Sequence, residues 1–343
     1  MKKLQNTLYI TTPDAYLSLD GENVVMSVDR EIRGQRPLHL LESIVIFGYP
    51  GASPALLGKC AEMGIMVTFL TPQGKFLSRC VGKTYGNVIV RRTQYRIADD
   101  SEKALHIARN MISAKLSNSA AVLRRVLSDH RERVDDIKIE QAAKQIKDGA
   151  VTAYSAESAD TLRGLEGECA NRYFSVFDEM ILQQKDFFTF DRRNRRPPMD
   201  PVNAMLSFGY ALMTSICTSA LETAGLDPYV GFFHTERPGR CSLALDLLEE
   251  FRAPFVDRFV LTMINKKIVT DASFTQKESG AVLLTDDARR DFLDQWQKKK
   301  YEEIQHPYLK EQVQWGMIPF VQAALLAKYI RGDLDDYPPF IWK

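Results

Sequence analysis

Residues 200–225 read DPVNAMLSFGYALMTSICTSALETAG, and this stretch decides the character of the larger part of the chain. Asp200 can cap a helix, and Pro201 suits the first helical turn because its missing amide hydrogen is not needed there. Gly225 can end the helix, since glycine adopts the left-handed conformation without strain. The sequence therefore predicts a helix over residues 201–224. Helical spacing recurs at 101–125, 135–146, 156–184, 242–252, 286–303 and 319–331.

The N-terminal part has a different pattern, because its apolar residues form short β-rich runs from Leu8 to about Cys80. Turn-forming glycines and prolines separate these runs, which lie at 8–10, 15–17, 24–26, 44–47 and 67–70. Residues 53–63 are the exception and predict one helix, capped by Ser53. We therefore expect an α+β protein with a small, mostly antiparallel β domain over 1–90, a hinge at about 82–98 and an all-helical domain over 99–343.

Composition limits the class of protein. With 343 residues, 45% hydrophobic and 26% charged, the chain is typical of a folded globular protein of two domains. Its five cysteines are dispersed and odd in number, so we expect reduced thiols. No apolar run approaches the roughly 20 residues of a membrane span. We expect a cytoplasmic protein without a membrane segment. Because 45 Lys and Arg residues nearly balance 44 Asp and Glu residues, any binding of nucleic acid must rely on local basic patches.

Glu166 is a candidate functional carboxylate. At 3.6 residues per turn it shares a helix face with Ala170, Tyr173 and Phe177, whereas Glu168 points elsewhere. A carboxylate on an inward face is costly unless it is paired or binds a cation. The segment by itself leaves two interpretations open, a buried Glu–Arg pair and a cation site.

A second group of candidates surrounds His234, which lies in a loop rich in glycine and proline before a predicted helix. On that helix Asp246 and Glu249 share a strip with Ser242, so two carboxylates project together. A divalent cation is a common reason to hold carboxylates close, and oxygen ligands with one imidazole suit Mg²⁺ or Mn²⁺. A histidine beside a solvated acidic face is the simpler alternative. Glu250 lies on the apolar face and ranks below Glu249.

Three weaker signals concern the surroundings of these candidates. A polar stripe on the 201–224 helix can line the same cleft or bond to neighbouring helices, and it consists of Asn203, Ser207 and Tyr210. A basic run can contact DNA phosphates or form a solvated loop, and it consists of Arg192, Arg193, Arg195 and Arg196. Other arginines near the candidate ligands can grip DNA or balance carboxylates, and they are Arg237, Arg240 and Arg252.

These segments together resemble the CRISPR-associated integrase and endonuclease family. The resemblance rests on order and gaps: Leu165-Glu166-Gly167 with Ala170 and Tyr173-Phe174, Asp200-Pro201-Val202-Asn203, Leu206-Ser207-Phe208-Gly209-Tyr210, the His234 loop, and LALDLLEEFR over 243–252. The end of the chain, over 329–342, resembles the subtype I-C branch. The β-rich start and helical remainder fit the two-domain build of the family.

The resemblance implies a metal site at Glu166, His234 and Glu249, with Asp246 in a supporting position. Many family members carry aspartate where this chain has Glu249. The implied activity is metal-dependent DNA cleavage and integration, in which new spacers enter the CRISPR array by 3′-hydroxyl attack on repeat phosphodiesters. Mg²⁺ or Mn²⁺ would be the cofactor. No nucleotide cofactor is expected, because transesterification exchanges one phosphodiester for another, and the sequence consistently has no GxxxxGK[ST] loop.

The resemblance also implies partners. These are double-stranded DNA, both the incoming spacer DNA and the CRISPR repeat, and a small ferredoxin-like CRISPR adaptation protein. A homodimer would form through the β domains, with two such dimers bridged by the small protein. Two alternatives are a stand-alone nuclease that acts on branched DNA and a non-catalytic scaffold of a DNA-binding complex.

Overall fold

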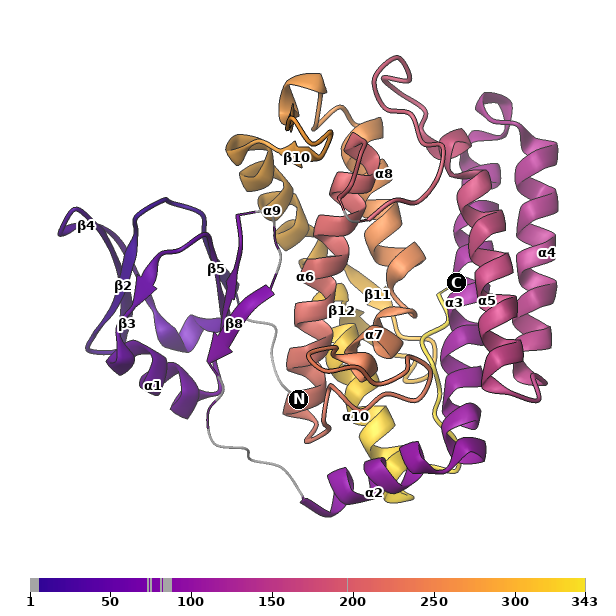
Figure 1. Cartoon of the computed structure of the whole chain (residues 1–343), viewed down its shortest axis with the longest axis horizontal. Coiled ribbons are helices and arrows are strands. Elements are labelled where there is room, and N and C mark those ends of the chain that lie inside the picture. The colour runs from indigo at the N-terminus through magenta and orange to yellow at the C-terminus, as the bar shows by residue number, and fades with distance from the viewer. Residues whose placement is uncertain are drawn as a thin grey trace. The chain divides into compact units, whose positions relative to one another are not determined.

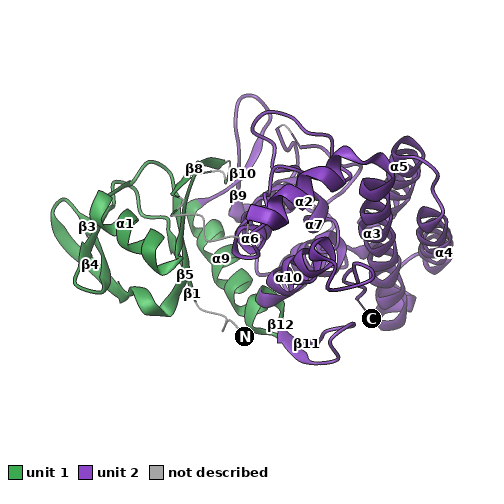
Figure 2. Cartoon of the chain, turned by 90° about the horizontal axis from the view of Figure 1, so that it is seen from below, with its two compact units in different colours: residues 1–85, 286–302, 314–316 green, residues 86–285, 303–313, 317–343 purple. Residues whose placement is uncertain are grey.

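The computed structural model describes residues 6–72, 74, 76–80, 82, 88–195 and 197–342. The chain forms two compact units, drawn in different colours in Figure 2. Unit 1 comprises residues 1–85, 286–302 and 314–316, and unit 2 comprises 86–285, 303–313 and 317–343. The expected division into 1–90 and 99–343 is therefore wrong for residues 286–302 and 314–316, which return to the N-terminal unit.

Unit 1 contains two four-stranded sheets (Figure 1). The first has the order β1 (Asn6–Ile10), β5 (Leu41–Phe47), β7 (Met66–Leu70) and β8 (Phe76–Cys80). The second has the order β4 (Glu31–Pro37), β3 (Asn23–Val28), β2 (Tyr16–Asp20) and β6 (Gly51–Ala52). Buried side chains of both sheets form one core, with Leu17, Ile44 and Val67 fully enclosed.

The described strands of the β domain mix antiparallel and parallel pairings, where the sequence analysis expects mostly antiparallel ones. Three pairings are antiparallel, β2–β3, β3–β4 and β7–β8. Three others are parallel, β1–β5, β5–β7 and β2–β6. Parallel neighbours need a crossover between them. The predicted helix supplies one such crossover: α1 (Pro54–Met63) links β5 to β7, begins at Ser53, which accepts a hydrogen bond from Leu56 N, and ends at Gly64 with φ of 70°.

Helix α9 (Asp286–Tyr301) belongs to unit 1 although it follows the long helical region in sequence. It buries Phe292 and Trp296. Its Lys300 is also buried and donates to Glu42 Oε1 at 2.6 Å and to Thr7 Oγ1 at 3.0 Å, both in the first sheet. A lysine in a charged run thus anchors the helix to the sheet.

Unit 2 is built mainly from helices. They are α2 (Val88–Asp99), α3 (Ser101–His130), α4 (Asp136–Tyr154), α5 (Ala159–Ser175), α6 (Pro201–Thr223), α7 (Ser242–Leu248), α8 (Arg258–Asn265) and α10 (Ile318–Arg331). The unit is not all-helical as expected, because β9 (Phe274–Gln276) and β10 (Val282–Leu284) form a two-stranded sheet. A further pair, β11 (Glu303–Gln305) and β12 (Gln312–Gln314), follows α9. Within the expected hinge over 82–98, the boundary between the two units falls between residues 85 and 86, residues 88–98 are helical, and 83–87 lie outside the described residues.

Helix α6 confirms the prediction made from its ends. Asp200 accepts a hydrogen bond from Asn203 N at 2.8 Å, Pro201 opens the helix, and Gly225 has φ of 81°. By length and hydropathy α6 is also able to cross a membrane, contrary to the expectation that no apolar stretch is long enough. Because 67% of the relevant window is buried inside the protein, we describe it as a core helix.

The predicted helix over 242–252 is interrupted. Helix α7 ends at Leu248, and residues Arg252–Asp257 form a π-helical segment that continues into α8. Pro254 has no amide hydrogen to donate, so a regular α-helix cannot run through it. The segment instead has Val256 N donating to Phe251 O at 3.3 Å, five residues back. Such insertions in helices are common at functional sites.

Candidate active site

A cavity of about 210 Å³ lies in unit 2 between α3, α5, α6 and the π-helical segment. We call it the central cavity. Its walls carry most of the charged residues selected from the sequence. The residues already singled out from the sequence that line it are Glu166, His234, Glu249, Arg193, Arg195, Tyr210 and Arg252. Other lining residues are Lys115, Ser119, Phe233 and Asp257.

Glu166 points inward from α5, as the helical spacing predicts. Its side chain is 22% exposed, whereas that of Glu168 is 59% exposed and pairs with Arg172. Glu166 Oε1 accepts a hydrogen bond from the ammonium group of Lys115 on α3. The glycines beside Glu166 do not explain the packing of α5, because nothing lies within 4 Å of a Cβ at Gly167. Close approach depends instead on Gly149 of α4, where a Cβ would lie 2.5 Å from Cys169 Sγ.

Glu249 lies at the end of α7 and turns into the central cavity. Its Oε2 is 2.7 Å from Lys115 Nζ, and its Oε1 is 2.9 Å from Arg252 Nε and 3.9 Å from His234 Nε2. Burial alone would raise the pKa of the Glu249 carboxyl, but the charges of Arg252, Lys115 and His234 outweigh it and lower the pKa to about 2. The carboxylate is therefore ionised within a cluster of cationic groups.

Asp246 does not line the central cavity and instead holds the His234 loop. Its Oδ2 accepts from Phe232 N at 2.7 Å and Phe233 N at 3.0 Å, and its Oδ1 accepts from His234 N at 2.9 Å. His234 Nδ1 is 2.7 Å from Oδ1. Gly231 is required beside it, because a Cβ there would lie 2.8 Å from Asp246 Oδ2. Asp246 and Glu249 thus diverge, although the helix pattern predicts that they project together.

Lys115 is the central residue that the sequence analysis missed. Burial would lower the pKa of Lys115, but the carboxylates of Glu249 and Glu166 outweigh it and raise the pKa, so the ammonium is charged. A signal was present in the sequence. Lys115 is flanked on the same face of α3 by Met111 and Ile112, both fully buried, and a lysine on an apolar face needs an acidic partner.

A network around Tyr210 and Asp257 also lines the central cavity and is joined to Glu249 through Arg252. The Tyr210 hydroxyl donates to Asp257 Oδ1 at 2.5 Å, and the Arg252 guanidinium lies over the Tyr210 ring at 4.5 Å from its centre. Burial raises the pKa of the Asp257 carboxyl to about 6. Of the predicted polar stripe, only Tyr210 lines the cavity. Asn203 is fully buried and donates to Asp200 Oδ2 at 2.7 Å, which makes it part of the helix start.

The basic run at 192–196 does not act as one unit. Arg193 is partly buried, donates to Ser207 Oγ at 2.9 Å, and contacts Asn203 Oδ1. Arg195 is exposed and lines the central cavity. Arg192 is exposed, lies outside the cavity lining and is 3.8 Å from Asp191. Arg196 lies outside the described residues. Neither a solvated loop nor a uniform phosphate-binding strip describes this run.

The other three predicted arginines differ in whether they line the central cavity. Arg252 is in the central cavity, paired with Glu249. Arg237 is exposed and Arg240 is half-buried in the loop after His234, and neither lines the cavity. Their sequence proximity to His234 therefore does not bring them to the candidate ligands.

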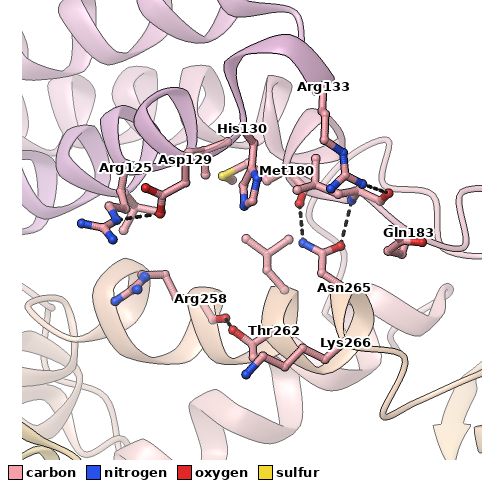
Figure 3. A pocket seen from close by; sticks show the side chains of 14 residues that line it. Arg125, Asp129, His130, Arg133, Met180, Gln183, Arg258, Thr262, Asn265 and Lys266 are labelled. Atoms are coloured by element: carbon pink, nitrogen blue, oxygen red, sulfur yellow. Dashed lines mark hydrogen bonds and ion pairs between the residues drawn. The ribbon is translucent and has the colours of Figure 1, made fainter.

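A second cavity of about 330 Å³, which we call the distal cavity, lies between the C-terminal part of α3 and α8 (Figure 3). Figure 3 shows Arg125, Asp129 and His130 from the end of α3 opposite Arg258 and Thr262 of α8. Four Arg or Lys side chains and a single acidic one line it, namely Arg125, Arg133, Arg258, Lys266 and Asp129. Sequence neighbours line the two cavities: Asp257 lines the central cavity and the next residue, Arg258, lines the distal cavity.

The donor set of the central cavity fits a divalent cation. Glu166 and Glu249 both direct a carboxylate oxygen to one cationic group, Lys115 Nζ. His234 contacts Asp246 through Nδ1, so its other ring nitrogen, Nε2, faces Glu249. Carboxylates with one imidazole are ligands of Mg²⁺ and Mn²⁺. Within the described part of the chain, however, no three His, Cys, Asp or Glu side chains already stand in an arrangement that could hold a metal ion.

Comparisons with known proteins place the chain in a family. The model of the family described as CRISPR associated protein Cas1 matches residues 8–298. The chain is 47% identical over 343 residues to CRISPR-associated endonuclease Cas1 1 of Chlorobaculum tepidum, and the match covers all of both chains.

Solved structures with low sequence identity have the same fold. One is a casposase bound to integration product, with a TM-score of 0.84, 24% identity and coverage of 99% of this chain and 95% of that one. Another is a Cas6-RT-Cas1–Cas2 complex, with a TM-score of 0.82, 21% identity and coverage of 100% of this chain and 36% of that one. The predicted α+β class is confirmed by this likeness, and the family match over most of the chain shows that it belongs to the CRISPR-associated Cas1 family.

Proposed function

We propose that this protein is a divalent-metal-dependent DNA endonuclease and integrase that inserts new spacers into a CRISPR array. The observation that carries the proposal is the convergence of Glu166 and Glu249 on one cationic position, with His234 Nε2 3.9 Å from Glu249 Oε1. The full-length relative from Chlorobaculum tepidum, which is named an endonuclease, supports the same reaction class.

Glu166, His234 and Glu249 would hold the cation, Mg²⁺ or Mn²⁺. When bound there, it would polarise the scissile phosphate and stabilise charge that develops on its oxygens. In integration, the 3′-hydroxyl oxygen of incoming DNA bonds to a repeat phosphorus, and the bond from that phosphorus to the repeat's 3′ oxygen breaks. The nucleophile gives its proton to water, and the departing 3′ oxygen takes a proton from water. One phosphodiester replaces another, so no nucleotide cofactor is needed.

The chain's own residues orient the reactants. Asp246 fixes the ring of His234, because its carboxylate accepts a hydrogen bond from Nδ1 and so keeps Nε2 directed toward Glu249. Arg195 supplies positive charge on the cavity wall for DNA phosphates. The basic lining of the distal cavity supports a continuation of the DNA path along α3 and α8.

The partners follow the same proposal. The solved structure of a Cas6-RT-Cas1–Cas2 complex supports a role of the chain beside a small adaptation protein. We propose that this partner is ferredoxin-like, that it bridges two homodimers formed through the β domains, and that the double-stranded substrates are incoming spacer DNA and the CRISPR repeat. A cytoplasmic location and the subtype I-C assignment remain predictions.

The decisive experiment compares Glu166→Ala with Glu168→Ala. Both carboxylates are on α5, but only Glu166 faces the central cavity. We expect Glu166→Ala to abolish Mn²⁺-dependent strand transfer of a short duplex into a plasmid that carries repeats, and Glu168→Ala to retain it. Equal loss in both variants, or wild-type transfer in the presence of EDTA, would contradict the metal site.

The same assay separates the alternatives. An integrase should join DNA ends only when the small partner is present. Efficient cutting of branched DNA without the partner, and no joining with it, would favour a stand-alone nuclease. Binding of DNA with neither reaction would favour a scaffold.

A further inference from the structure

Lys115 stands between the two carboxylates of the proposed metal site. Its ammonium contacts Glu166 Oε1 and is 2.7 Å from Glu249 Oε2. The side chain is only 13% exposed, so these contacts are made largely out of water. Interactions between charges are stronger there than at the surface. Lys115 is therefore a firmly held cation and not a solvated one.

A metal ion and this ammonium compete for the same oxygens. A divalent cation coordinated by Glu166 and Glu249 would lie within a few ångströms of Lys115 Nζ if the lysine kept its present position. Like charges at that distance repel strongly in a buried site. Glu249 is in addition paired with Arg252, at 2.9 Å between Nε and Oε1, so the carboxylate charge is already balanced by the protein.

The central cavity offers Lys115 another partner. Lys115 lines the cavity together with Arg193 and Arg195, the side on which the proposed DNA phosphate would approach. An ammonium on a flexible four-carbon stem can change partners by rotating side-chain bonds. A phosphate in the cavity would draw Lys115 away from Glu166 and Glu249 and leave these carboxylates free for the cation.

We propose, on the basis of the proposed function, that Lys115 is a positioning residue that competes with the divalent cation for Glu166 and Glu249. When DNA binds, Lys115 changes its partner to a DNA phosphate, and this change couples metal binding to DNA binding. Metal binding and DNA binding are then mutually reinforcing, because each removes an obstacle to the other. Coupling of this kind is reciprocal by thermodynamic necessity.

The test measures Mn²⁺ affinity directly, by electron paramagnetic resonance of free Mn²⁺, with and without a short duplex whose scissile linkage resists cleavage. For the wild type we expect the duplex to tighten Mn²⁺ binding by about tenfold. Lys115→Met should bind Mn²⁺ about tenfold more tightly than the wild type without DNA, and the duplex should add little. Lys115→Arg keeps a cation and should retain weak binding without DNA.

Lys138→Met is the matched control, since Lys138 is an exposed lysine on α4 paired with Glu179. It should leave Mn²⁺ affinity unchanged. Circular dichroism checks that each variant is folded; if Lys115→Met is not, Lys115→Gln takes its place. Unchanged or weaker Mn²⁺ binding by the folded neutral variant would overturn the inference.

A further variant, Glu166→Gln, separates this inference from the proposed function. If Glu166→Gln weakens Mn²⁺ binding but the neutral Lys115 variant has wild-type affinity, the metal site stands and the competition is wrong. If the wild type binds no Mn²⁺ with or without DNA, both proposals are wrong.

Discussion

His234 Nδ1 lies 2.7 Å from Asp246 Oδ1, and the same carboxylate accepts three backbone amide hydrogens from residues 232–234. Asp246 is fully buried, so no water replaces these contacts. One carboxylate thus fixes both the loop and the orientation of the imidazole. This arrangement explains why the two acidic residues on α7 are not interchangeable: Asp246 supports the histidine, whereas Glu249 faces the central cavity.

The first prediction concerns Asp246→Asn. In the variant an NH₂ group replaces one carboxylate oxygen and faces a backbone N–H, so two donors meet. We therefore expect the free energy of unfolding to fall by about 1–3 kcal/mol. Strand transfer should fall as well, through misorientation of His234. Urea denaturation measures the first effect. Asp160→Asn, at a side chain 92% exposed, is the control and should change neither quantity. Unaltered stability would show that the loop does not depend on Asp246.

The second prediction concerns Glu249. Glu249→Ala leaves Arg252 without its carboxylate partner in a buried site, so we expect the fold itself to lose about 3–5 kcal/mol, in addition to loss of activity. The double variant Lys115→Met, Glu249→Gln removes one cation together with the charge and should be more stable than Glu249→Ala. Thermal unfolding of the three proteins provides the comparison. A Glu249→Ala protein as stable as the wild type would mean that this ion cluster contributes nothing to folding.

The third prediction separates Arg195 from Arg192. Arg195 lines the central cavity and Arg192 does not. Arg195→Ala should weaken duplex binding and reduce the salt dependence of log affinity by about 0.9 if one phosphate contact is lost. Arg192→Ala should match the wild type. Fluorescence anisotropy over a series of salt concentrations measures both. Equal effects of the two variants would mean that the arginines of this run attract DNA only through their overall charge, and not through a contact in the central cavity.

The fourth prediction concerns the distal cavity. The double variant Arg125→Ala, Lys266→Ala removes two of its cationic side chains. We expect weaker binding of long duplexes, whereas short duplexes that end at the central cavity should bind as before. Cleavage at saturating DNA should persist, because the candidate ligands are untouched. An equal loss for long and short duplexes would place the distal cavity off the DNA path.

The fifth prediction uses Glu250, which is fully buried and accepts from Tyr337 Oη at 2.6 Å and Phe340 N at 2.7 Å. Burial raises its pKa from 4.5 to about 7, despite the opposing effect of these hydrogen bonds. Between these two pH values the folded state keeps a proton that the unfolded state has released. The unfolding free energy should therefore fall as pH rises through this window, by roughly 3 kcal/mol in total.

Glu250→Gln cannot titrate and should lack this part of the pH dependence. Urea denaturation of metal-free protein in EDTA at several pH values between 4.5 and 8 tests the difference between variant and wild type. Glu168→Gln, at an exposed site, should keep the wild-type slope. Parallel curves for Glu250→Gln and the wild type would mean that Glu250 is ionised in the fold.

The sequence by itself determined the features that depend on local physics. The ends of α6 follow from a capping aspartate, a proline at the first turn and a glycine at the stop, each of which acts within a few residues. The choice of Glu166 over Glu168 follows from helical periodicity, which does not depend on the rest of the fold. The change from β-rich to helical pattern was also sufficient for the α+β class.

Only the tertiary structure decided which distant residues meet. Lys115 lies 51 residues before Glu166 and 134 before Glu249, so no local pattern connects it to them. The return of α9 to the first unit depends on Lys300 pairing with Glu42, again across most of the chain. The parallel pairings of β1, β5 and β7 likewise depend on crossovers. Local sequence sets the shape of each element, but the partners of a buried charge are set by packing, because burial is a property of the whole fold.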